Sequence, residues 1–408
     1  MTSITQNKGK TTSTKELEFI AIMAFLMSNV ALAIDAILPA LTHIGHSLHE
    51  AKASSLQLII TMIFLGLGIG QLIFGTLSDS FGRKPTVYWG VGIFMLASFI
   101  CVTAATLEMM LLGRVLQGVG LSAPRTVSIS IIRDSYSGDR MARIMSFISV
   151  IFILIPMIAP VLGQVILLRF SWQAIFYFQL VFITITVVWF QKRQPETLPE
   201  SQRVSFSRKE FVKGFKEFFK FRNTVIFTII EGLMEGSFIL YLSVSKQVFQ
   251  DQYQLVDEFP YIFAGIAFML GLATFINGAL VTKYGMKKLV ARALILFSIL
   301  SLGFLLLFPQ STNPPLFVLL FFLTLQFISY GFILGNLSAL ALQPIGHIAG
   351  TGASVFSVIS TIISVFLAVL AGRYLTTTVA PLFVTFFGSS VVALLLLSLT
   401  KRKIQKQT

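Results

Sequence analysis

The sequence has few charged residues and a single cysteine. Charged residues make up 12% of the 408, against roughly a quarter in soluble domains, whereas hydrophobic residues make up 55% and the mean hydropathy is +0.84. This composition excludes a soluble globular fold and indicates a protein that crosses a membrane many times. The lone cysteine, Cys101, excludes an intrachain disulfide and a metal site built from several thiolates. No Walker A sequence is present, which excludes direct use of ATP through that motif.

Catalytic and metal-binding patterns are also absent. Three of the four histidines, His43, His46 and His49, recur every third residue and would lie roughly along one helix face, which leaves a weak surface metal site as one interpretation. No acid or cysteine with the spacing of a metal motif accompanies them, so we expect a solvated outer loop instead. The sequence therefore predicts no enzyme activity, no cofactor and no metal. The net charge of +14 does not indicate a nucleic-acid partner, because the basic residues form no patch among aromatic side chains.

Hydrophobic runs recur along the chain at lengths that suit membrane-spanning helices. Six runs precede a polar segment at 192–222 and six follow it. We therefore expect an all-α membrane protein of twelve transmembrane helices, in two pseudo-symmetric six-helix halves at 17–191 and 223–400, with short tails at 1–16 and 401–408. The twelve runs lie near 17–42, 54–77, 86–106, 109–131, 145–168, 173–191, 223–246, 259–281, 288–308, 314–340, 350–372 and 378–400.

Lysine and arginine are distributed unevenly between the two sides of this arrangement. The segments on one side hold only Lys52, Arg169, Lys246 and Arg373, two arginines lie inside spans, and all other basic residues fall on the opposite side. Because cytoplasmic loops are enriched in basic residues, we expect both termini in the cytoplasm.

The polar segment at 192–222 is predicted to link the two halves. Phe211, Phe215, Phe218 and Phe219 are interspersed with lysines there. This pattern favours an amphipathic helix that lies on the anionic inner leaflet. A solvated linker without fixed structure remains the alternative.

A short polar loop between the second and third runs is the most informative stretch. It reads Gly75-Thr-Leu77-Ser-Asp79-Ser-Phe-Gly82-Arg83-Lys84-Pro85. A second copy, Gly278-Ala-Leu280-Val-Thr282-Lys-Tyr-Gly285-Met286-Lys287-Lys288, follows 203 residues later and keeps the glycines and a basic charge. In that copy Thr282 and Met286 stand in place of the acid and the arginine, so the acidic partner is present only in the first half.

The first copy resembles the loop motif between the second and third helices of the major facilitator superfamily. This resemblance implies two parallel six-helix repeats and a gate on the cytoplasmic side. There Asp79 would act on the N-terminus of the eleventh helix, near Gly350, through the helix dipole and hold the outward-facing state; alternatively, Asp79 only fixes the loop. The expected gating residues are Gly75, Asp79, Gly82, Arg83, Lys84 and Asp134, the last of which ends the fourth helix.

Two further stretches resemble motifs of the same superfamily. The stretch Leu112-Gly-Arg114-Val-Leu-Gln117-Gly118-Val-Gly120 resembles its fourth-helix motif, which places an arginine inside the membrane. The stretch Ile155-Pro156-Met-Ile-Ala159-Pro160-Val-Leu-Gly163-Gln164 resembles its fifth-helix antiporter motif, although Ala159 and Gln164 stand where that motif has glycines. The expected antiporter residues are Pro156, Pro160 and Gly163, and the two prolines should bend the helix.

The first helix carries the sequence Ala33-Ile-Asp35-Ala-Ile-Leu-Pro39-Ala-Leu. Together with Ser171-Trp172-Gln-Ala-Ile-Phe176 and Ile132-Arg133-Asp134, it is similar to the drug:proton antiporters of the Bcr/CflA group. The similarity covers residues 18–200 well and the second half thinly. It implies a role for Asp35 in substrate or proton handling.

Three acids lie inside predicted spans, where a charge must be neutralised, paired or hydrated. They are Asp35 in the first helix and Glu231 and Glu235 in the seventh, and the repeat brings Asp35 and Glu235 to similar depths, so both could face one central cavity. Burial favours proton uptake by such carboxylates and an arriving cation favours proton release. Alternatives remain: a structural hydrogen bond or a pair with Arg114 for Asp35, and a solvated or interhelical contact for Glu231. Arg125, about three turns beyond Arg114, either faces the cavity or reaches for the cytoplasmic surface.

The sequence thus predicts a monomeric, proton-coupled antiporter that exports lipophilic, cationic drugs by alternating access. We expect protons, a small-molecule substrate and the lipid bilayer as its partners. The alternative is an exporter of one endogenous metabolite, such as a siderophore or sugar, in which Arg114 and Arg125 would meet an anionic substrate. Coupling and substrate contacts are predicted for Asp35, Arg114, Gln117, Glu231 and Glu235, with Phe176, Phe238 and Tyr241 lining the cavity.

Overall fold

The computed structural model describes residues 14–50, 52–203, 215–308, 313–375 and 378–400, and within these ranges the chain is helical and has no strand. The predicted C-terminal tail, most of the N-terminal tail and Phe211 of the predicted amphipathic helix lie outside the described residues. The α-helices are α1 (Thr14–Asp35), α2 (Leu41–Ser47), α3 (Ala53–Phe81), α4 (Arg83–Val102), α5 (Leu107–Ser135), α6 (Gly138–Leu167), α7 (Gln173–Arg193), α9 (Arg222–Lys246), α10 (Phe259–Tyr284), α11 (Met286–Leu307), α12 (Leu316–Gly331), α13 (Leu334–Leu342), α14 (Ala349–Gly372) and α15 (Ala380–Ser398).

The predicted number of membrane spans is confirmed. Among the described residues, eleven helices or continuous helical stretches are long and apolar enough to cross a membrane. The twelfth span is α6, a continuous helix that includes a shorter apolar stretch at Leu154–Leu167. The protein is therefore an all-α membrane protein with twelve spans, as the hydrophobic runs indicated.

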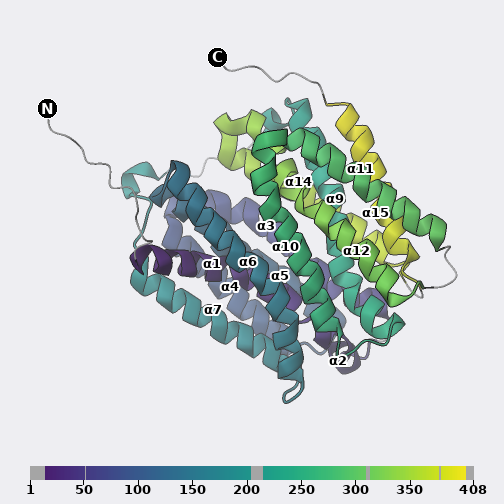
Figure 1. The fold of residues 1–408 in the computed structure, drawn as a ribbon. Coiled ribbons are helices and arrows are strands. Elements are labelled where there is room, and N and C mark those ends of the chain that lie inside the picture. Colours follow the sequence, from purple (N-terminus) through teal and green to yellow (C-terminus); the bar gives the residue numbers. More distant parts are fainter. Residues whose placement is uncertain (1–13, 51, 204–214, 309–312, 376–377, 401–408) are drawn as a thin grey trace.

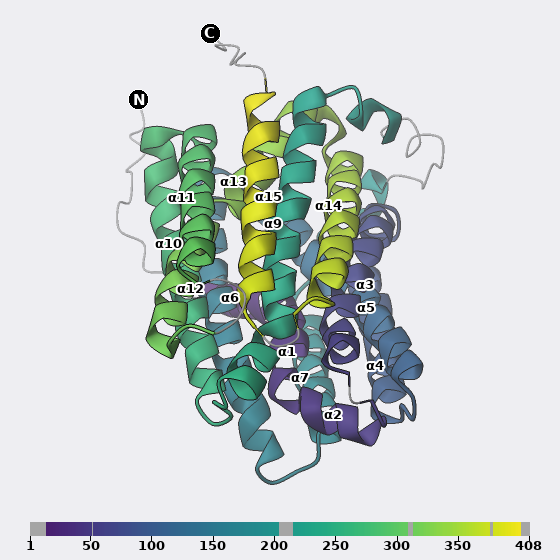
Figure 2. The same cartoon turned by 90° about the vertical axis from the view of Figure 1, so that its right-hand side faces the viewer.

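The helices form two halves that lie side by side (Figures 1 and 2). The first half holds α1 to α7 and the second holds α9 to α15. The halves meet along two helix pairs, α3 with α14 and α6 with α10. The pair α3 and α14 is antiparallel, from Gln57 beside Gly372 at one end to Gly75 beside Ser354 at the other. Because the contact runs along both helices, the two halves touch over much of the thickness of the molecule.

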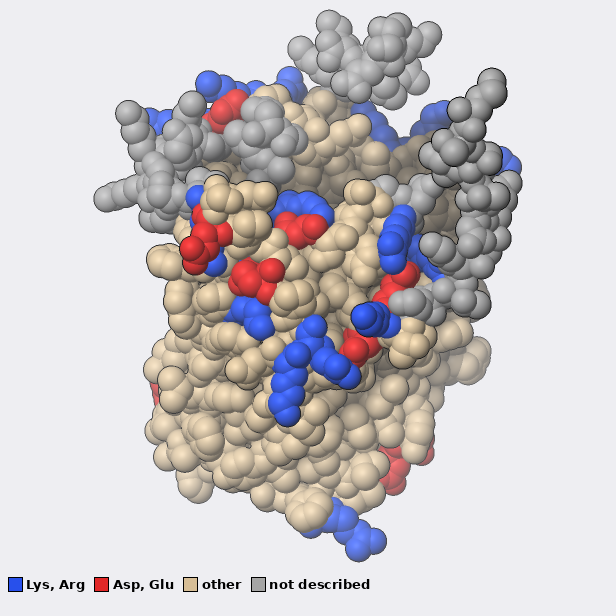
Figure 3. All heavy atoms as spheres, turned by 90° about the vertical axis from the view of Figure 1, so that its left-hand side faces the viewer, with Lys and Arg blue, Asp and Glu red and all other residues tan. Residues whose placement is uncertain are grey.

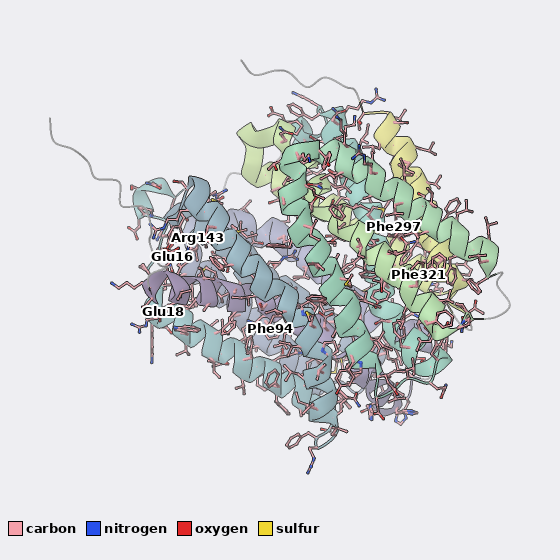
Figure 4. The ribbon with its side chains drawn as sticks, in the orientation of Figure 1. Glu16, Glu18, Phe94, Arg143, Phe297 and Phe321 are labelled. Atoms are coloured by element: carbon pink, nitrogen blue, oxygen red, sulfur yellow. The ribbon has the colours of Figure 1, made fainter. Side chains whose placement is uncertain are left out.

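The two ends of the molecule differ in what they carry. One end, which we call the linker side, holds the start of α1, the end of α15 (Figure 2) and the loop at Gly82, which contacts Glu196 and Arg203 of the segment after α7. The other end, the far side, holds α2 and the start of α3. The face drawn in Figure 3 gathers charged residues over its upper part and leaves its lower part almost uncharged. Glu16 and Glu18 lie at the linker-side end of α1 (Figure 4) and bind Arg140 of α6 and Arg193 of α7 at 2.9 and 2.8 Å.

The two halves repeat the same internal contacts. In the first half Gln117 of α5 donates a hydrogen bond to the Ser98 hydroxyl of α4 at 2.8 Å. In the second half Gln326 of α12 donates one to the Ser301 hydroxyl of α11 at 2.7 Å. The two serines are 203 residues apart, the same offset as the two loop motifs. The predicted internal repeat is therefore confirmed by side-chain contacts as well as by helix order.

Both copies of the loop turn on a glycine with positive φ. Gly82 separates α3 from α4 with a φ of 104°, and Gly285 separates α10 from α11 with a φ of 80°. Residues with a Cβ rarely adopt this conformation, whereas glycine does so at little steric cost. The turn at Gly82 thus has its equivalent in the second half.

The first predicted span is broken within its hydrophobic run. The helix α1 ends at Asp35, and a short 3₁₀ turn at Leu38–Ala40 leads into α2. Pro39 has no backbone N–H to donate to the preceding turn and so cannot continue the helix. The run at 17–42 therefore contributes two helical pieces, and the acid predicted to handle protons lies at their junction.

Candidate functional site

Asp35 is buried at the broken end of α1. Its side chain is 4% exposed, and its Oδ1 atom has no hydrogen-bond partner among the described residues. A buried carboxylate without a donor is costly when ionised, because it has lost its hydration without replacement. Asp35 is therefore placed where a proton or a cation would be stabilised.

Arg114 is fully buried and binds the neighbouring helices rather than Asp35. Its Nε donates to the carbonyl of Ile59 at 2.8 Å, its Nη1 to Oε1 of Gln117 at 2.8 Å, and its Nη2 to the carbonyl of Ala33 at 3.0 Å. Ala33 lies in the last turn of α1, where carbonyls lack partners within the helix. The guanidinium thus stabilises the broken helix end. No ion pair joins Arg114 to Asp35 among the described residues, so the pair considered from the sequence is not formed.

The helix α6 covers this break closely. A Cβ on Gly163 would lie 2.0 Å from the carbonyl oxygen of Ala36, well inside van der Waals contact, so only glycine fits there. Pro156 and Pro160 lie within the same helix, which continues through both of them. The three residues of the predicted antiporter motif are thus on the helix that packs against the end of α1.

The two acids of α9 have different surroundings. Glu231 is 7% exposed; its Oε1 accepts a hydrogen bond from Ser338 of α13 at 2.8 Å, and its Oε2 is buried without a partner among the described residues. This is the interhelical contact that was one of two predictions for Glu231. Glu235, one turn further along, and the partly buried Arg125 of α5 attract each other electrostatically across the two halves. Of the two predictions for Arg125, this arrangement favours a side chain that points toward the other half rather than toward the cytoplasmic surface.

Aromatic side chains gather around the middle of α9. The rings of Tyr241 and Phe327 meet edge to face with centroids 4.5 Å apart, and Phe263 lies stacked near Tyr241 at 6.2 Å. Phe238, partly buried, lies 6.0 Å from Phe327. Phe176, which was predicted to line the cavity with Phe238 and Tyr241, is fully buried in α7. The aromatic cluster of Phe238, Tyr241, Phe263 and Phe327 therefore lies in the second half.

Arg83 joins three helices on the linker side. Its side chain is 3% exposed and starts α4; Nη1 binds Asp79 at 2.6 Å and Ser78 at 2.8 Å, both in α3. Its Nε donates to Asp134 at the end of α5 at 2.8 Å. Thr197, beyond α7, also donates to Asp134 at 3.1 Å. The structure thus brings together Asp79, Arg83 and Asp134, three of the predicted gating residues.

Glu196 completes this cluster, although the sequence did not single it out. Its carboxylate accepts hydrogen bonds from the backbone N–H groups of Arg83, Lys84, Thr197 and Leu198 at 2.9 to 3.0 Å. Arg83 and Lys84 are the first residues of α4, so Glu196 caps a helix N-terminus, where the unpaired N–H groups favour an anion. Partial burial opposes ionisation of Glu196, but the four N–H donors outweigh it and lower its pKa.

The remaining gating residues have other neighbours. Lys84 Nζ donates to the carbonyl of Gln191 near the end of α7 at 3.1 Å. A Cβ on Gly75 would lie 3.3 Å from the Ser354 hydroxyl, so the start of α14 passes beside the motif. Asp79 itself binds Arg83. The action of Asp79 on the N-terminus of α14, the predicted eleventh span, stays a prediction.

On the far side an amide contact joins the two halves. Gln57 of α3 donates from Nε2 to Oε1 of Gln247 at 2.7 Å, and Gln247 donates to the carbonyl of Leu375 beyond α14. Both glutamines are buried, and a Cβ on Gly372 would lie 2.3 Å from Oε1 of Gln57. Gln247 begins a π-helical stretch, Gln247–Gln252, which follows α9, and such stretches are frequent at functional sites. We call Gln57, Gln247 and Leu375 the amide clamp.

The histidines of the far side do not form a metal site. His43 and His46 are exposed on α2, and His49 follows α2 with a φ of 55°. In the part of the chain that the structure describes, no group of three or more His, Cys, Asp or Glu could hold a metal ion. His43 and His46 are thus exposed to solvent as expected, but they lie on a short helix rather than in a loop.

The contacts that sequence reasoning missed are long-range. Glu196 lies 113 residues from Arg83, and Gln57 lies 190 from Gln247. One signal was available for the glutamines, since a polar side chain within a hydrophobic run needs a partner. Glu196 offered a weaker signal, as an acid just beyond a basic helix end.

Comparisons with known proteins agree with this architecture. Residues 19–368 match the family model described as Major Facilitator Superfamily. A bicyclomycin resistance protein homolog of Haemophilus influenzae is 26% identical over 390 residues, which is 92% of this chain and 94% of that protein. The multidrug resistance protein MdtL of Salmonella paratyphi A is 35% identical over 159 residues, 38% of this chain and 40% of that protein. These relatives are consistent with the drug:proton antiporter group that the sequence resembles.

Solved structures show the same fold. The crystal structure of a D-xylose-proton symporter covers 94% of this chain and 96% of its own, with a TM-score of 0.73 and 14% identity. At this identity the likeness concerns the fold alone. The family match, the two repeated halves and the loop motif at Gly82 show that the chain belongs to the Major Facilitator Superfamily and is a membrane transporter, not an enzyme.

Proposed function

We propose that the protein is a proton-coupled antiporter that exports lipophilic cations, including drugs, by alternating access. It acts as a monomer in the bacterial inner membrane with the linker side in the cytoplasm. The observation that carries the proposal is Asp35, a buried acid with a partnerless oxygen at the break in α1. The names of the relatives, a bicyclomycin resistance homolog and a multidrug resistance protein, support drugs as the substrate class.

The chemistry of exchange follows from competition for a buried carboxylate. A proton neutralises Asp35 and so avoids the cost of an uncompensated charge in a low-dielectric site. A cationic substrate stabilises the ionised form and expels the proton. Glu231 and Glu235 add acidic groups on α9 in the opposite half, and the aromatic side chains near Tyr241 suit an apolar cation.

Two sets of contacts support alternating access. On the linker side Asp79, Arg83, Asp134 and Glu196 hold α3, α4 and α5 to the segment after α7. On the far side the amide clamp joins α3 to the ends of α9 and α14. Release of substrate to the far side requires the clamp to open, whereas the ionic cluster lies within the first half and can move as a unit.

Export of one endogenous metabolite is the second candidate. An anionic substrate would need a free cation, and the guanidinium of Arg114 already binds two carbonyls and Gln117. Arg125 remains, but it lies within the electrostatic reach of Glu235. The arrangement therefore favours a cationic substrate.

Proton release on substrate addition tests the proposal. Purified protein in weakly buffered detergent is mixed with lipophilic cations and, separately, with polycarboxylates. Asp35→Asn and Glu235→Gln are measured alongside Glu200→Gln, which changes a side chain that is 88% exposed. We expect cations to release protons from the wild type and from Glu200→Gln, and release to be lost in Asp35→Asn. Unchanged release in Asp35→Asn would remove Asp35 as the carrier, and a response to polycarboxylates alone would favour the metabolite exporter.

A further inference from the structure

We propose that Tyr241 is the hydrogen-bond donor that stabilises ionised Asp35 across the interface between the two halves. This inference rests on the proposed function, because it concerns the same exchange site. It assigns to the hydroxyl of Tyr241 a positioning role that is separate from the contacts of its ring with Phe263 and Phe327.

The first observation is that two buried polar atoms lack partners on opposite sides of one interface. Oδ1 of Asp35 and Oη of Tyr241 are both buried without a hydrogen-bond partner among the described residues. The two side chains are 4% and 3% exposed. A buried polar atom left unpaired costs free energy, so each of these atoms favours a state in which it gains a partner.

The second observation is that the segment just after Asp35 packs against the helix that carries Tyr241. The 3₁₀ turn Leu38–Ala40, just after Asp35, packs against α9. The charge of Asp35 acts electrostatically on the hydroxyl of Tyr241. A hydroxyl close to a carboxylate but not bonded to it can reach it by a small movement of the halves or through one water molecule.

The third observation is that the ring of Tyr241 is held while its hydroxyl is free. Phe327 meets the ring edge to face at 4.5 Å, and Phe263 lies stacked near it with planes 14° apart. The neighbouring Tyr330 differs, because its hydroxyl already donates to the carbonyl of Met234. Of these two phenols only Tyr241 has its hydroxyl available for a new bond.

Other ionisable groups near Asp35 are engaged or distant. Arg114 on α5 gives its bonds to Ile59, Gln117 and Ala33. The charged side chains described on α6 and α7 lie near their linker-side ends. Arg125 acts on Glu235, and Glu231 binds Ser338. Among these ionisable groups, the phenol of Tyr241 is thus the one with a hydrogen free for ionised Asp35.

The bond would depend on the state of the site. Ionised Asp35 accepts a hydrogen bond from Tyr241. This bond draws α1 of the first half toward α9 of the second. A proton on Asp35, or the positive charge of a bound cation, compensates the carboxylate instead and frees the phenol. The contact between α1 and α9 therefore depends on the charge of Asp35.

The test compares Tyr241→Phe with Tyr330→Phe, which removes the same atom from the same aromatic cluster. Proton release on addition of a lipophilic cation, tetraphenylphosphonium, is measured from pH 5 to 9. Above the midpoint pH Asp35 is already ionised and no proton is released. Without the phenol the ionised form is less stable, so we expect the midpoint in Tyr241→Phe to rise by about 1 to 2 pH units.

The control should behave as the wild type, because the Tyr330 hydroxyl is bound to a backbone carbonyl. In an Asp35→Asn background, Tyr241→Phe should have no further effect on binding of the cation. A midpoint in Tyr241→Phe that equals the wild-type value would overturn the inference while leaving proton-coupled exchange intact. Absence of proton release from the wild type would instead refute the proposed function.

Discussion

Loss of the Glu196 carboxylate should loosen the linker side of the first half. In Glu196→Ala the N-terminus of α4 loses the oxygens that accept from Arg83 and Lys84, and the N–H groups of Thr197 and Leu198 lose the same acceptor. Removal of a helix cap costs about 0.5–2 kcal/mol, and an anion at a helix N-terminus contributes about 0.3–1 kcal/mol. Because Glu196 is partly exposed, water replaces some of these bonds, and we expect a loss of about 2 kcal/mol at neutral pH.

The pH dependence follows from the direction of the pKa shift. The pKa of Glu196 is lowered in the folded protein by the four N–H donors, despite its burial. Its contribution is therefore fully present above the unfolded value of about 4.3. The contribution is lost as the pH falls through the lower folded value. The difference between wild type and Glu196→Ala should be large at pH 7 and should shrink as the pH falls below about 4.3 toward the lower folded value.

Thermal unfolding in detergent, followed by the fluorescence of the three tryptophans, measures this difference. The matched control is Glu200→Ala, four residues away, whose side chain is 88% exposed and lies 3.5 Å from Arg203. We expect Glu196→Ala to lower the unfolding temperature by several degrees and Glu200→Ala to leave it nearly unchanged. Equal losses in the two variants, or a Glu196→Ala loss that is the same at pH 7 and pH 4, would refute the reasoning.

Three further variants test the packing and the contacts between the halves. In a cysteine-free background, Gln57→Cys with Gln247→Cys should be cross-linked by a bifunctional methanethiosulfonate reagent, which spans the space left by the two shortened side chains, because Nε2 of Gln57 and Oε1 of Gln247 are 2.7 Å apart. The link should stop transport until it is reduced; transport that continues despite a cross-link would contradict a gating role for the clamp. Gly163→Ala should abolish transport because the added methyl would collide with the backbone of Ala36, just after α1, whereas Gly92→Ala, with open space around it, should not; normal transport by both variants would count against a fixed contact between α6 and the break after α1. Arg83→Lys should lower transport at least tenfold, since lysine cannot bind two carboxylates with one planar group; wild-type rates would show that charge alone is sufficient there.

The fold could be predicted well because its signals are local or repeated. Hydrophobic runs set the spans, and the loop motif with its copy at Gly285 identified the two halves. The break in α1 was missed, although Pro39 was visible, because the hydrophobic run continues past it to α2. Composition reports which residues suit the membrane, whereas a helix break depends on backbone hydrogen bonds that only the packed structure supplies.

The candidate site was predicted less completely. The acids were found because a charge within an apolar run is conspicuous, and the motif identified Arg83 with Asp134. The partners of Arg114 were not predictable, because two of its three acceptors are backbone carbonyls, which every residue possesses. The amide clamp was equally hidden, since it joins neutral side chains 190 residues apart.

The differences between the two repeats separate what the fold needs from what the first half adds. Gly82 and Gly285 share a positive φ, and Gln117 and Gln326 make the same bond to a serine, so these features belong to the packing of either half. Arg114, which lies three residues before Gln117, has no counterpart in the second half. The buried Leu323 stands at the equivalent position, three residues before Gln326.

In the second half a different residue type makes the equivalent contact to the first helix of that half, α9. The hydroxyl of Tyr330 in α12 donates to the carbonyl of Met234 in α9, in the way that Arg114 of α5 donates to Ala33 of α1. A neutral phenol is sufficient for that contact, so packing alone does not require a charge. The guanidinium of Arg114 is therefore explained by the two carbonyls that it binds together, that of Ala33 in the last turn of α1 and that of Ile59 in α3. It follows that Arg114→Gln should impair proton release even at temperatures at which the variant is still folded. Tyr330→Phe should lower the unfolding temperature and leave proton release unchanged.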